Sequence, residues 1–227
     1  MSSTLVPPVV AAAEDECLTI LGLPWSSYIA INDAVGDQPK LRLLYLDGGL
    51  TLLSPARRHS WSEDVLDKIV LAVAVACQIE MDVVGNATIR KEDREAGLEG
   101  DKVYYLGANA TLMAGPLEID LAIHPPPDLA IEVENTHKAT GALRIYARLG
   151  VPEVWRHDVR CGTLGFFALQ PDGTYAPIPR SLGFPCLTPT DLLFQVDQAA
   201  AIGSHIRWFA QLNDWARDVI RPRLDPA

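Results

Sequence analysis

Basic residues, paired cysteines and long apolar runs are all scarce in this chain of 227 residues. Its 19 Lys and Arg against 29 Asp and Glu give a net charge of −10, which argues against broad electrostatic binding of nucleic acid. The four cysteines form no CxxC pair, so neither a zinc ribbon nor a redox motif is indicated. The longest apolar run, 69–77, is too short to span a membrane. These absences favour a cytoplasmic protein with free thiols and no membrane partner.

The N-terminal segment 1–15 differs in character from the rest of the chain. It is rich in Pro and Ala, lacks the basic start of a secretory signal, and is predicted to be a loose arm. A hydrophobic fraction of 48% supports a sizeable core. No long linker divides the remainder, so residues 16–227 are predicted to form one domain. Strands and helices are interleaved, which indicates an α/β or α+β fold with a mixed sheet.

The clearest local signals are one hairpin and two helices. Apolar runs joined by Asp47-Gly48-Gly49 predict a β-hairpin over 40–53. Apolar residues at helical spacing predict a long helix over 57–80, and Gly150 marks the end of a helix over 142–149. Further strands are predicted over 83–91, 103–106, 117–123, 128–133, 152–156 and 162–169, and further helices over 187–196 and 202–220.

Two carboxylates lie close to the end of the predicted strand 128–133. Glu132 and Glu134 are two residues apart, so they point to the same face of a strand. Buried like charges repel unless a cation lies between them, and a divalent metal ion is a usual candidate. Asp101, before another short strand, and the Val133 carbonyl add possible ligands. The set predicts a metal site for phosphodiester hydrolysis; the alternative is a group of solvated surface charges.

The residues around these carboxylates carry a longer pattern, PPPDLAIEVE at 125–134 and IYARLGVPEVWRHD at 145–158. This pattern resembles the Uma-two-type restriction endonucleases of the PD-(D/E)XK nuclease superfamily, and the resemblance extends from about 41 to 194. It implies a restriction-endonuclease-like core, with a mixed central sheet flanked by helices and an N-terminal β-hairpin. It also implies a DNA endonuclease that depends on Mg²⁺ or Mn²⁺. Asp101 and Glu132 would bind the metal and Glu134 would assist, whereas Asp128 is interpreted as the residue that begins the strand.

Two positions depart from the family pattern. Ala142 stands where the family has a basic residue on the helix after the glutamate strand, and Ser60 stands where the first long helix has glutamate. Lys138, in the loop after the strand, is the predicted replacement for the missing base. Arg144 and Glu63 are interpreted as solvent-facing charges. The alternative function is therefore that of an inactive family member that binds a partner or acts as a scaffold.

Two further groups of residues suggest partners. Arg57, Arg58 and His59 form a small basic patch, which is predicted to contact a DNA backbone; the alternative is that these residues are simply solvated. Trp208 and Trp215 lie on one face of the last predicted helix, where they would either pack on the core or form the seam of a dimer. Nucleases that cut both strands are commonly two-fold symmetric, so a homodimer is predicted.

Overall fold

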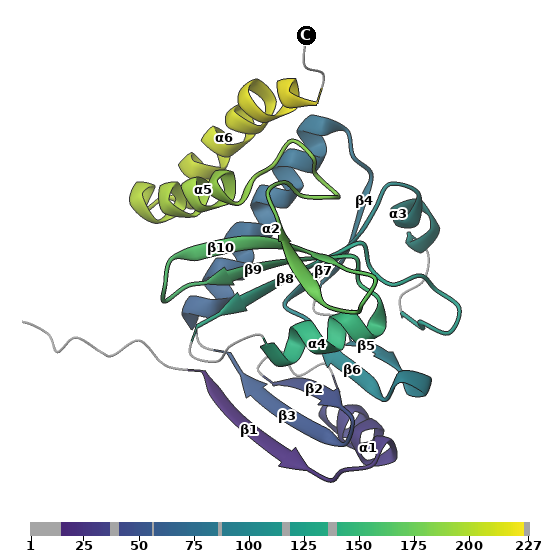
Figure 1. The fold of residues 1–227 in the computed structure, drawn as a ribbon. Coiled ribbons are helices and arrows are strands. Elements are labelled where there is room, and N and C mark those ends of the chain that lie inside the picture. The colour runs from purple at the N-terminus through teal and green to yellow at the C-terminus, as the bar shows by residue number, and fades with distance from the viewer. Residues whose placement is uncertain are drawn as a thin grey trace, which may run out of the picture.

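The computed structural model describes residues 15–36, 41–55, 57–85, 88–114, 119–135 and 140–224, and their strands form two sheets (Figure 1). The five-stranded sheet has the order β1-β3-β2-β6-β5 and is antiparallel. The six-stranded sheet, β11-β10-β9-β8-β7-β4, contains one parallel pair, β8 with β9. The strands are β1 Glu16–Leu21, β2 Arg42–Leu46, β3 Gly49–Ser54, β4 Met81–Gly85, β5 Thr88–Lys91, β6 Ala96–Glu99, β7 Lys102–Leu106, β8 Leu129–Glu134, β9 Glu153–Asp158, β10 Thr163–Leu169 and β11 Tyr175–Ile178.

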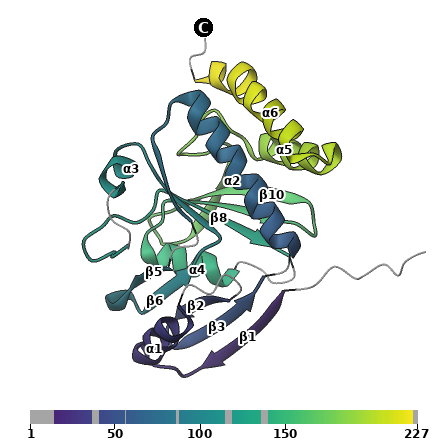
Figure 2. The ribbon, with the colours of Figure 1, turned by 180° about the vertical axis from the view of Figure 1, so that it is seen from behind.

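The helices cover and separate the two sheets. They are α1 Trp25–Val35, α2 Arg57–Cys77, α3 Ala108–Met113, α4 Thr140–Leu149, α5 Pro189–Ile202 and α6 His205–Trp215. Helices α2, α5 and α6 pack on one side of the six-stranded sheet, while α4 lies between the sheets and α1 lies against the five-stranded sheet (Figures 1 and 2). The predicted α/β architecture, with a mixed sheet flanked by helices and a hairpin near the N-terminus, is confirmed.

The predicted hairpin is the β2–β3 pair. Asp47 and Gly48 have φ of 46° and 83°, and positive φ at both loop positions is typical of the tight turn that matches the twist of antiparallel strands. Leu43 and Tyr45 face the cluster under α1, whereas Leu44 and Leu46 pack toward α4. Because side chains alternate along a strand, Arg42 shares the face of Leu44 and enters the space between the sheets.

Helix α2 is the longest element and carries three buried polar residues, His59, Ser62 and Glu63. Its apolar face, which includes Val65, Leu66 and Ile69, packs against Leu129 and Ile131 of β8. It ends three residues before the predicted limit, at Cys77, where Gln78 takes a φ of 55°. Its first turns bring buried polar residues to the edge of this core.

The predicted strands differ from the structure in several places, including β6, Ala96–Glu99, where no strand was predicted. The single strand predicted over 83–91 is two strands, β4 and β5, which belong to different sheets. Within the described part of the predicted strand 117–123, residues 119–123 form no strand, and Ala122 donates its N–H to Asp120 instead. Strand β1, at the edge of the five-stranded sheet, was not predicted. Its six residues are all exposed, so no buried face imposes an apolar pattern on them.

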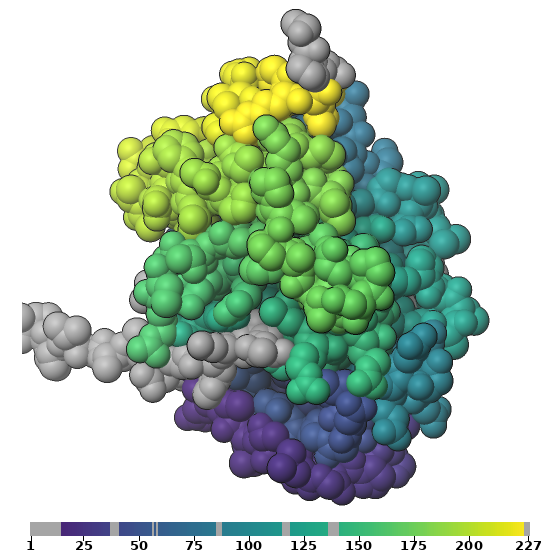
Figure 3. Space-filling model, in the orientation of Figure 1, coloured from purple at the N-terminus to yellow at the C-terminus, as the bar shows by residue number. Residues whose placement is uncertain are grey.

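The C-terminal helices lie at the opposite end of the molecule from the N-terminal strands (Figure 3). Helix α6 continues into a π-helical turn, Ala216–Ile220, which packs on α2. Trp208 is buried and Trp215 is partly buried against the same core, so both tryptophans pack on the core rather than form an exposed seam.

Neither a disulfide nor a membrane-spanning helix is found in the part of the chain that the structure describes. The four cysteines are free, as predicted. No helix in the described ranges combines the length and the apolar character that a membrane crossing requires.

Candidate metal centre

Asp101, in the turn between β6 and β7, is the centre of a buried polar cluster. Its Oδ2 accepts the Val133 N–H of β8 at 2.7 Å and lies 2.8 Å from His59 Nε2. Its Oδ1 accepts from Arg42, at the start of β2. The side chain is 3% exposed. Three elements distant in the sequence therefore converge on one carboxylate.

Helix α2 supplies an imidazole and a second carboxylate. His59 and Glu63 are four residues apart, so they lie on one side of the helix, and His59 Nε2 is 3.0 Å from Glu63 Oε1. The ligand-type atoms of His59, Glu63 and Asp101 all lie within 4.8 Å of one another. Glu63 is buried, so its interpretation as a solvent-facing charge was wrong. It provides the helix carboxylate that Ser60, which is exposed, does not.

The charges around Glu63 set its protonation. Burial tends to raise the pKa of the Glu63 carboxyl, but the hydrogen bond from His59 and the positive charge of Arg42 outweigh burial and lower it. Glu63 is therefore an anion at neutral pH. His59 Nδ1 makes no hydrogen bond to any described residue and lies 3.8 Å from the Asp15 carboxylate.

Glu132, near the end of β8, faces the same region from a different side. Tyr146 of α4 donates its OH to Glu132 Oε1 at 2.6 Å. Burial raises the pKa of Glu132 to about 7, although the Tyr146 hydrogen bond and the charges of Arg42 and His59 act in the opposite direction. Burial also raises the pKa of Tyr146 well above its ordinary value, so its hydroxyl remains a donor. Glu132 is thus a buried carboxyl that can gain or lose a proton near neutral pH.

Glu134 does not join this cluster. Its carboxylate pairs with the guanidinium of Arg156 on β9, with Arg156 Nη2 at 2.9 Å from Oε2. Glu132 and Glu134 are therefore stabilised separately, by a tyrosine and an arginine, and not around one shared cation. Val133 contributes its N–H, whereas its carbonyl was the predicted ligand.

The other predicted site residues that the structure describes, Asp128, Arg57 and His59, do not form one group. Asp128 accepts the Leu106 N–H at 2.8 Å, as expected of a residue that begins a strand. Arg57 is exposed but His59 is 2% exposed, so the expectation that they share a surface patch was wrong. The Arg58 side chain and Lys138 lie outside what the structure describes.

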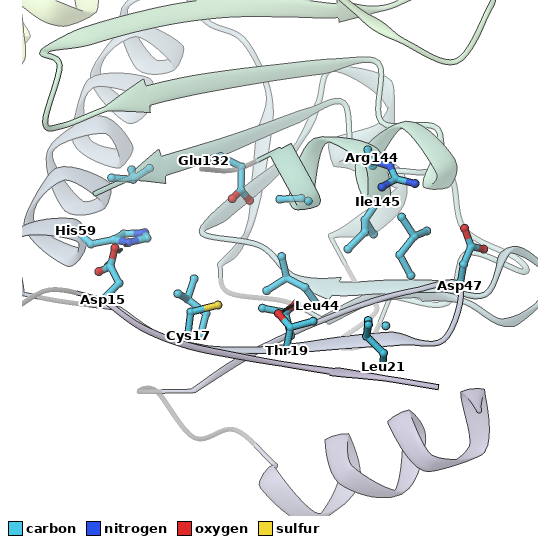
Figure 4. Close-up of a pocket in the computed structure, with 17 residues that line it drawn as sticks. Asp15, Cys17, Thr19, Leu21, Leu44, Asp47, His59, Glu132, Arg144 and Ile145 are labelled. Atoms are coloured by element: carbon cyan, nitrogen blue, oxygen red, sulfur yellow. Dashed lines mark hydrogen bonds and ion pairs between the residues drawn. The ribbon is translucent and has the colours of Figure 1, made fainter. Parts of the chain in front are cut away.

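A pocket of about 550 Å³ adjoins the cluster (Figure 4). It lies between the five-stranded sheet and α4. His59 and Glu132 line one end, and Asp47 and Arg144 line the other (Figure 4). Ala142 is buried and lines the pocket as Glu132 does. Arg144, although exposed, lines the pocket as well, so it does not simply face away from the site.

The chemistry of the donor set fits a divalent cation. Carboxylate oxygens suit Mg²⁺ and Mn²⁺, and imidazole suits transition metals. His59, Glu63 and Asp101 offer this mixture within one buried cluster. The other ring nitrogen of His59, Nδ1, lies 3.8 Å from Asp15 Oδ1, which is beyond hydrogen-bond distance.

Glu132 is expected to make the metal-free protein less stable as the pH rises from 5 to 8. Its pKa rises from 4.5, the ordinary value, to about 7 in the folded protein. Between these two pH values only the folded state retains the proton. The contribution of Glu132 to the free energy of unfolding is therefore fully present below pH 4.5, and it is lost as the pH rises through 7. The loss is roughly 3 kcal/mol.

Thermal unfolding in EDTA at pH 5 and pH 8 measures this effect. Glu132→Gln, which cannot ionise, is expected to lack this part of the pH dependence. A stability difference between the two proteins that is the same at both pH values would contradict the assignment.

The sequence did not indicate Asp15, Arg42 or Tyr146, and it led to the wrong setting for two others: Glu63 was interpreted as a solvent-facing charge and His59 as part of a surface patch. The spacing of Glu63 from His59 was the one available signal, because four residues is one helical turn. Arg42 occupies an ordinary polar position in an alternating strand, and Tyr146 lies in a helix whose register toward β8 only the fold defines.

Comparison with known families gives one match. The Uma2 family model, described as "Putative restriction endonuclease", matches residues 25–199. The match includes Arg42, His59, Asp101 and Glu132, whereas Asp15 and β1 precede it. No curated protein matches the chain.

Proposed function

We propose that this chain, which belongs to the Uma2 family, cleaves phosphodiester bonds of DNA with the help of Mg²⁺ or Mn²⁺. The family match supports a nuclease-like role. The observation that carries the proposal is the buried cluster of His59, Glu63 and Asp101, whose ligand-type atoms lie within 4.8 Å of one another. Carboxylate and imidazole ligands of this kind suit a divalent cation, and metal-assisted hydrolysis is the chemistry that uses one.

Each residue has a proposed task. His59, Glu63 and Asp101 would hold the cation, which when bound supplies a Lewis acid for the phosphate and a lowered pKa for water. The Val133 N–H keeps Asp101 oriented. Tyr146 orients Glu132, which has a pKa of about 7 and is therefore suited to exchange a proton at its carboxyl oxygens or, once ionised, to complete the ligand set.

The pocket is the proposed route for the substrate. Its end at His59 and Glu132 touches the cluster, and its other end carries Arg144, whose positive charge suits a phosphate. The walls are contributed by strands β1, β2 and β3 and by helix α4. A segment of nucleic-acid chain that enters here would bring a phosphate toward Asp101.

The direct test is cleavage of supercoiled plasmid DNA by the purified protein. Slow nicking is expected in Mg²⁺ or Mn²⁺, and none is expected in EDTA, because the cluster requires a cation for hydrolysis. Nicking that continues in EDTA would contradict the metal-dependent mechanism. Sedimentation of the same sample tests the homodimer, which remains a prediction.

Ala142 favours a second candidate, a protein that binds metal or DNA without cutting. Its methyl group lines the pocket near Glu132, where the resemblance predicts a basic side chain, and an alanine can neither orient water nor stabilise a developing negative charge. Binding of Mn²⁺ by calorimetry without plasmid nicking would support this candidate over the first.

A further inference from the structure

Arg42 is a buried cation inside the carboxylate cluster. It is 3% exposed. Its Nη2 lies 2.7 Å from Glu63 Oε1, and its Nη1 donates to Asp101 Oδ1. One guanidinium therefore holds two carboxylates that come from α2 and from the turn before β7. These are the same two carboxylates that form the candidate metal centre with His59.

The charge of Arg42 explains how the cluster remains folded without a metal. Glu63, Asp101 and Glu132 are all buried, and buried carboxylates are costly unless a cation or hydrogen bonds compensate them. Arg42 supplies a permanent positive charge, because a guanidinium does not lose its proton in proteins. Its planar fork can reach two acceptors at once, which a lysine would not reproduce.

The same contacts oppose a divalent cation. A cation bound by Glu63 and Asp101 would need oxygen lone pairs that now accept from Arg42. It would also lie close to a guanidinium of like charge, and such repulsion is strong where water is excluded. Arg42 and the metal are therefore alternatives for at least part of the site.

We propose that Arg42 is an internal counter-ion with which a divalent cation must compete for Glu63 and Asp101. The inference rests on the proposed metal-dependent function. It adds that Arg42 weakens cation binding while it stabilises the metal-free protein. Removal of Arg42 is therefore expected to lower the stability of the metal-free protein and to strengthen cation binding. A merely structural arginine would, when removed, weaken cation binding together with the fold.

Arg42→Met removes the charge and keeps most of the side-chain volume. In calorimetric titrations with MnCl₂, its dissociation constant is expected to be at least about tenfold lower than that of the unmodified protein, because the like charge that repels the cation is removed. Arg156→Met is the matched control, since it also removes a guanidinium from a buried carboxylate, that of Glu134, but outside the cluster. Its Mn²⁺ affinity is expected to stay within about twofold, because it does not touch Glu63 or Asp101.

Thermal unfolding supplies the second measurement. In EDTA, both variants are expected to melt below the unmodified protein, and Mn²⁺ is expected to raise the melting temperature of Arg42→Met the most. Arg42→Gln, which keeps a donor but not the charge, is measured in parallel. If both Arg42 variants are unfolded in EDTA, recovery of the fold in Mn²⁺ supports the proposal, and failure to recover overturns it.

The results also separate this inference from the proposed function. Mn²⁺ affinity that is equal or weaker in Arg42→Met overturns the role of Arg42, even where the unmodified protein nicks plasmid DNA. Tighter Mn²⁺ binding without nicking by any of the proteins leaves the competition intact and removes the nuclease assignment.

Discussion

Asp101→Asn is expected to lower metal-dependent DNA cleavage by more than about 100-fold, because it removes the central anion of the cluster. Asp101 is the residue on which Arg42, His59 and the Val133 N–H converge. Asparagine keeps the shape and one acceptor oxygen, but its amide nitrogen cannot accept a hydrogen bond or bind a cation. Rates of plasmid nicking over a range of Mn²⁺ concentrations measure the loss and show whether excess metal restores activity.

Asp128→Asn is the matched control for this experiment. Asp128 is also a carboxylate that accepts a backbone N–H of a neighbouring strand, that of Leu106, and its second oxygen accepts from Asn109, which lies outside the cluster. Cleavage by Asp128→Asn is expected to follow its folded fraction. If Asp101→Asn and Asp128→Asn cleave equally well, the metal centre has no role in the reaction.

Ala142→Lys is expected to raise metal-dependent cleavage about 100-fold, which is the usual contribution of one well-placed catalytic group. Ala142 and Glu132 line the same pocket, so a lysine at 142 has about 550 Å³ of open space to enter. Its ammonium group would form an ion pair with Glu132 and would contact a substrate phosphate. The initial rate of plasmid nicking, compared with that of the unmodified protein, measures the gain.

Ala147→Lys separates position from charge. Ala147 lies on the same helix but does not line the pocket beside Glu132, so a lysine there is expected to leave the rate near its starting value. Nicking that appears only in Ala142→Lys would favour the binding protein as the natural function. Equal rates for the two lysine variants would show that Ala142 is not a missing catalytic position.

Much of the local structure was predictable because it depends on neighbouring residues. The turn at Asp47-Gly48 needs positive φ at both positions, and this residue pair tolerates it. Gly150 ends α4 with a φ of 84° for the same reason. The strand predicted over 128–133 is β8, although all six of its residues are buried and neither face is solvated.

Of the three carboxylates predicted to share one site, the structure brings together two. Asp101 and Glu132 lie in one region, joined through Val133, whereas Glu134 is paired with Arg156. Strand alternation shows that Glu132 and Glu134 share a face, but it does not show which side chains approach them from β9 and α4. Glu132 accepts a hydrogen bond from Tyr146, and Glu134 pairs with Arg156. The spacing of the two glutamates alone therefore did not define a metal site.

The sequence by itself determined most of the elements, the family and the carboxylates available for chemistry, because turn geometry, side-chain periodicity and motif spacing act over short stretches of chain. Tertiary structure alone decided that Glu63 would join Asp101 and that Arg42 would lie between them. Arg42 and Asp101 are 59 residues apart, and the free energy of burying an ion depends on the partners that the fold brings to it. Those partners turn a group of ordinary charged residues into a single candidate centre.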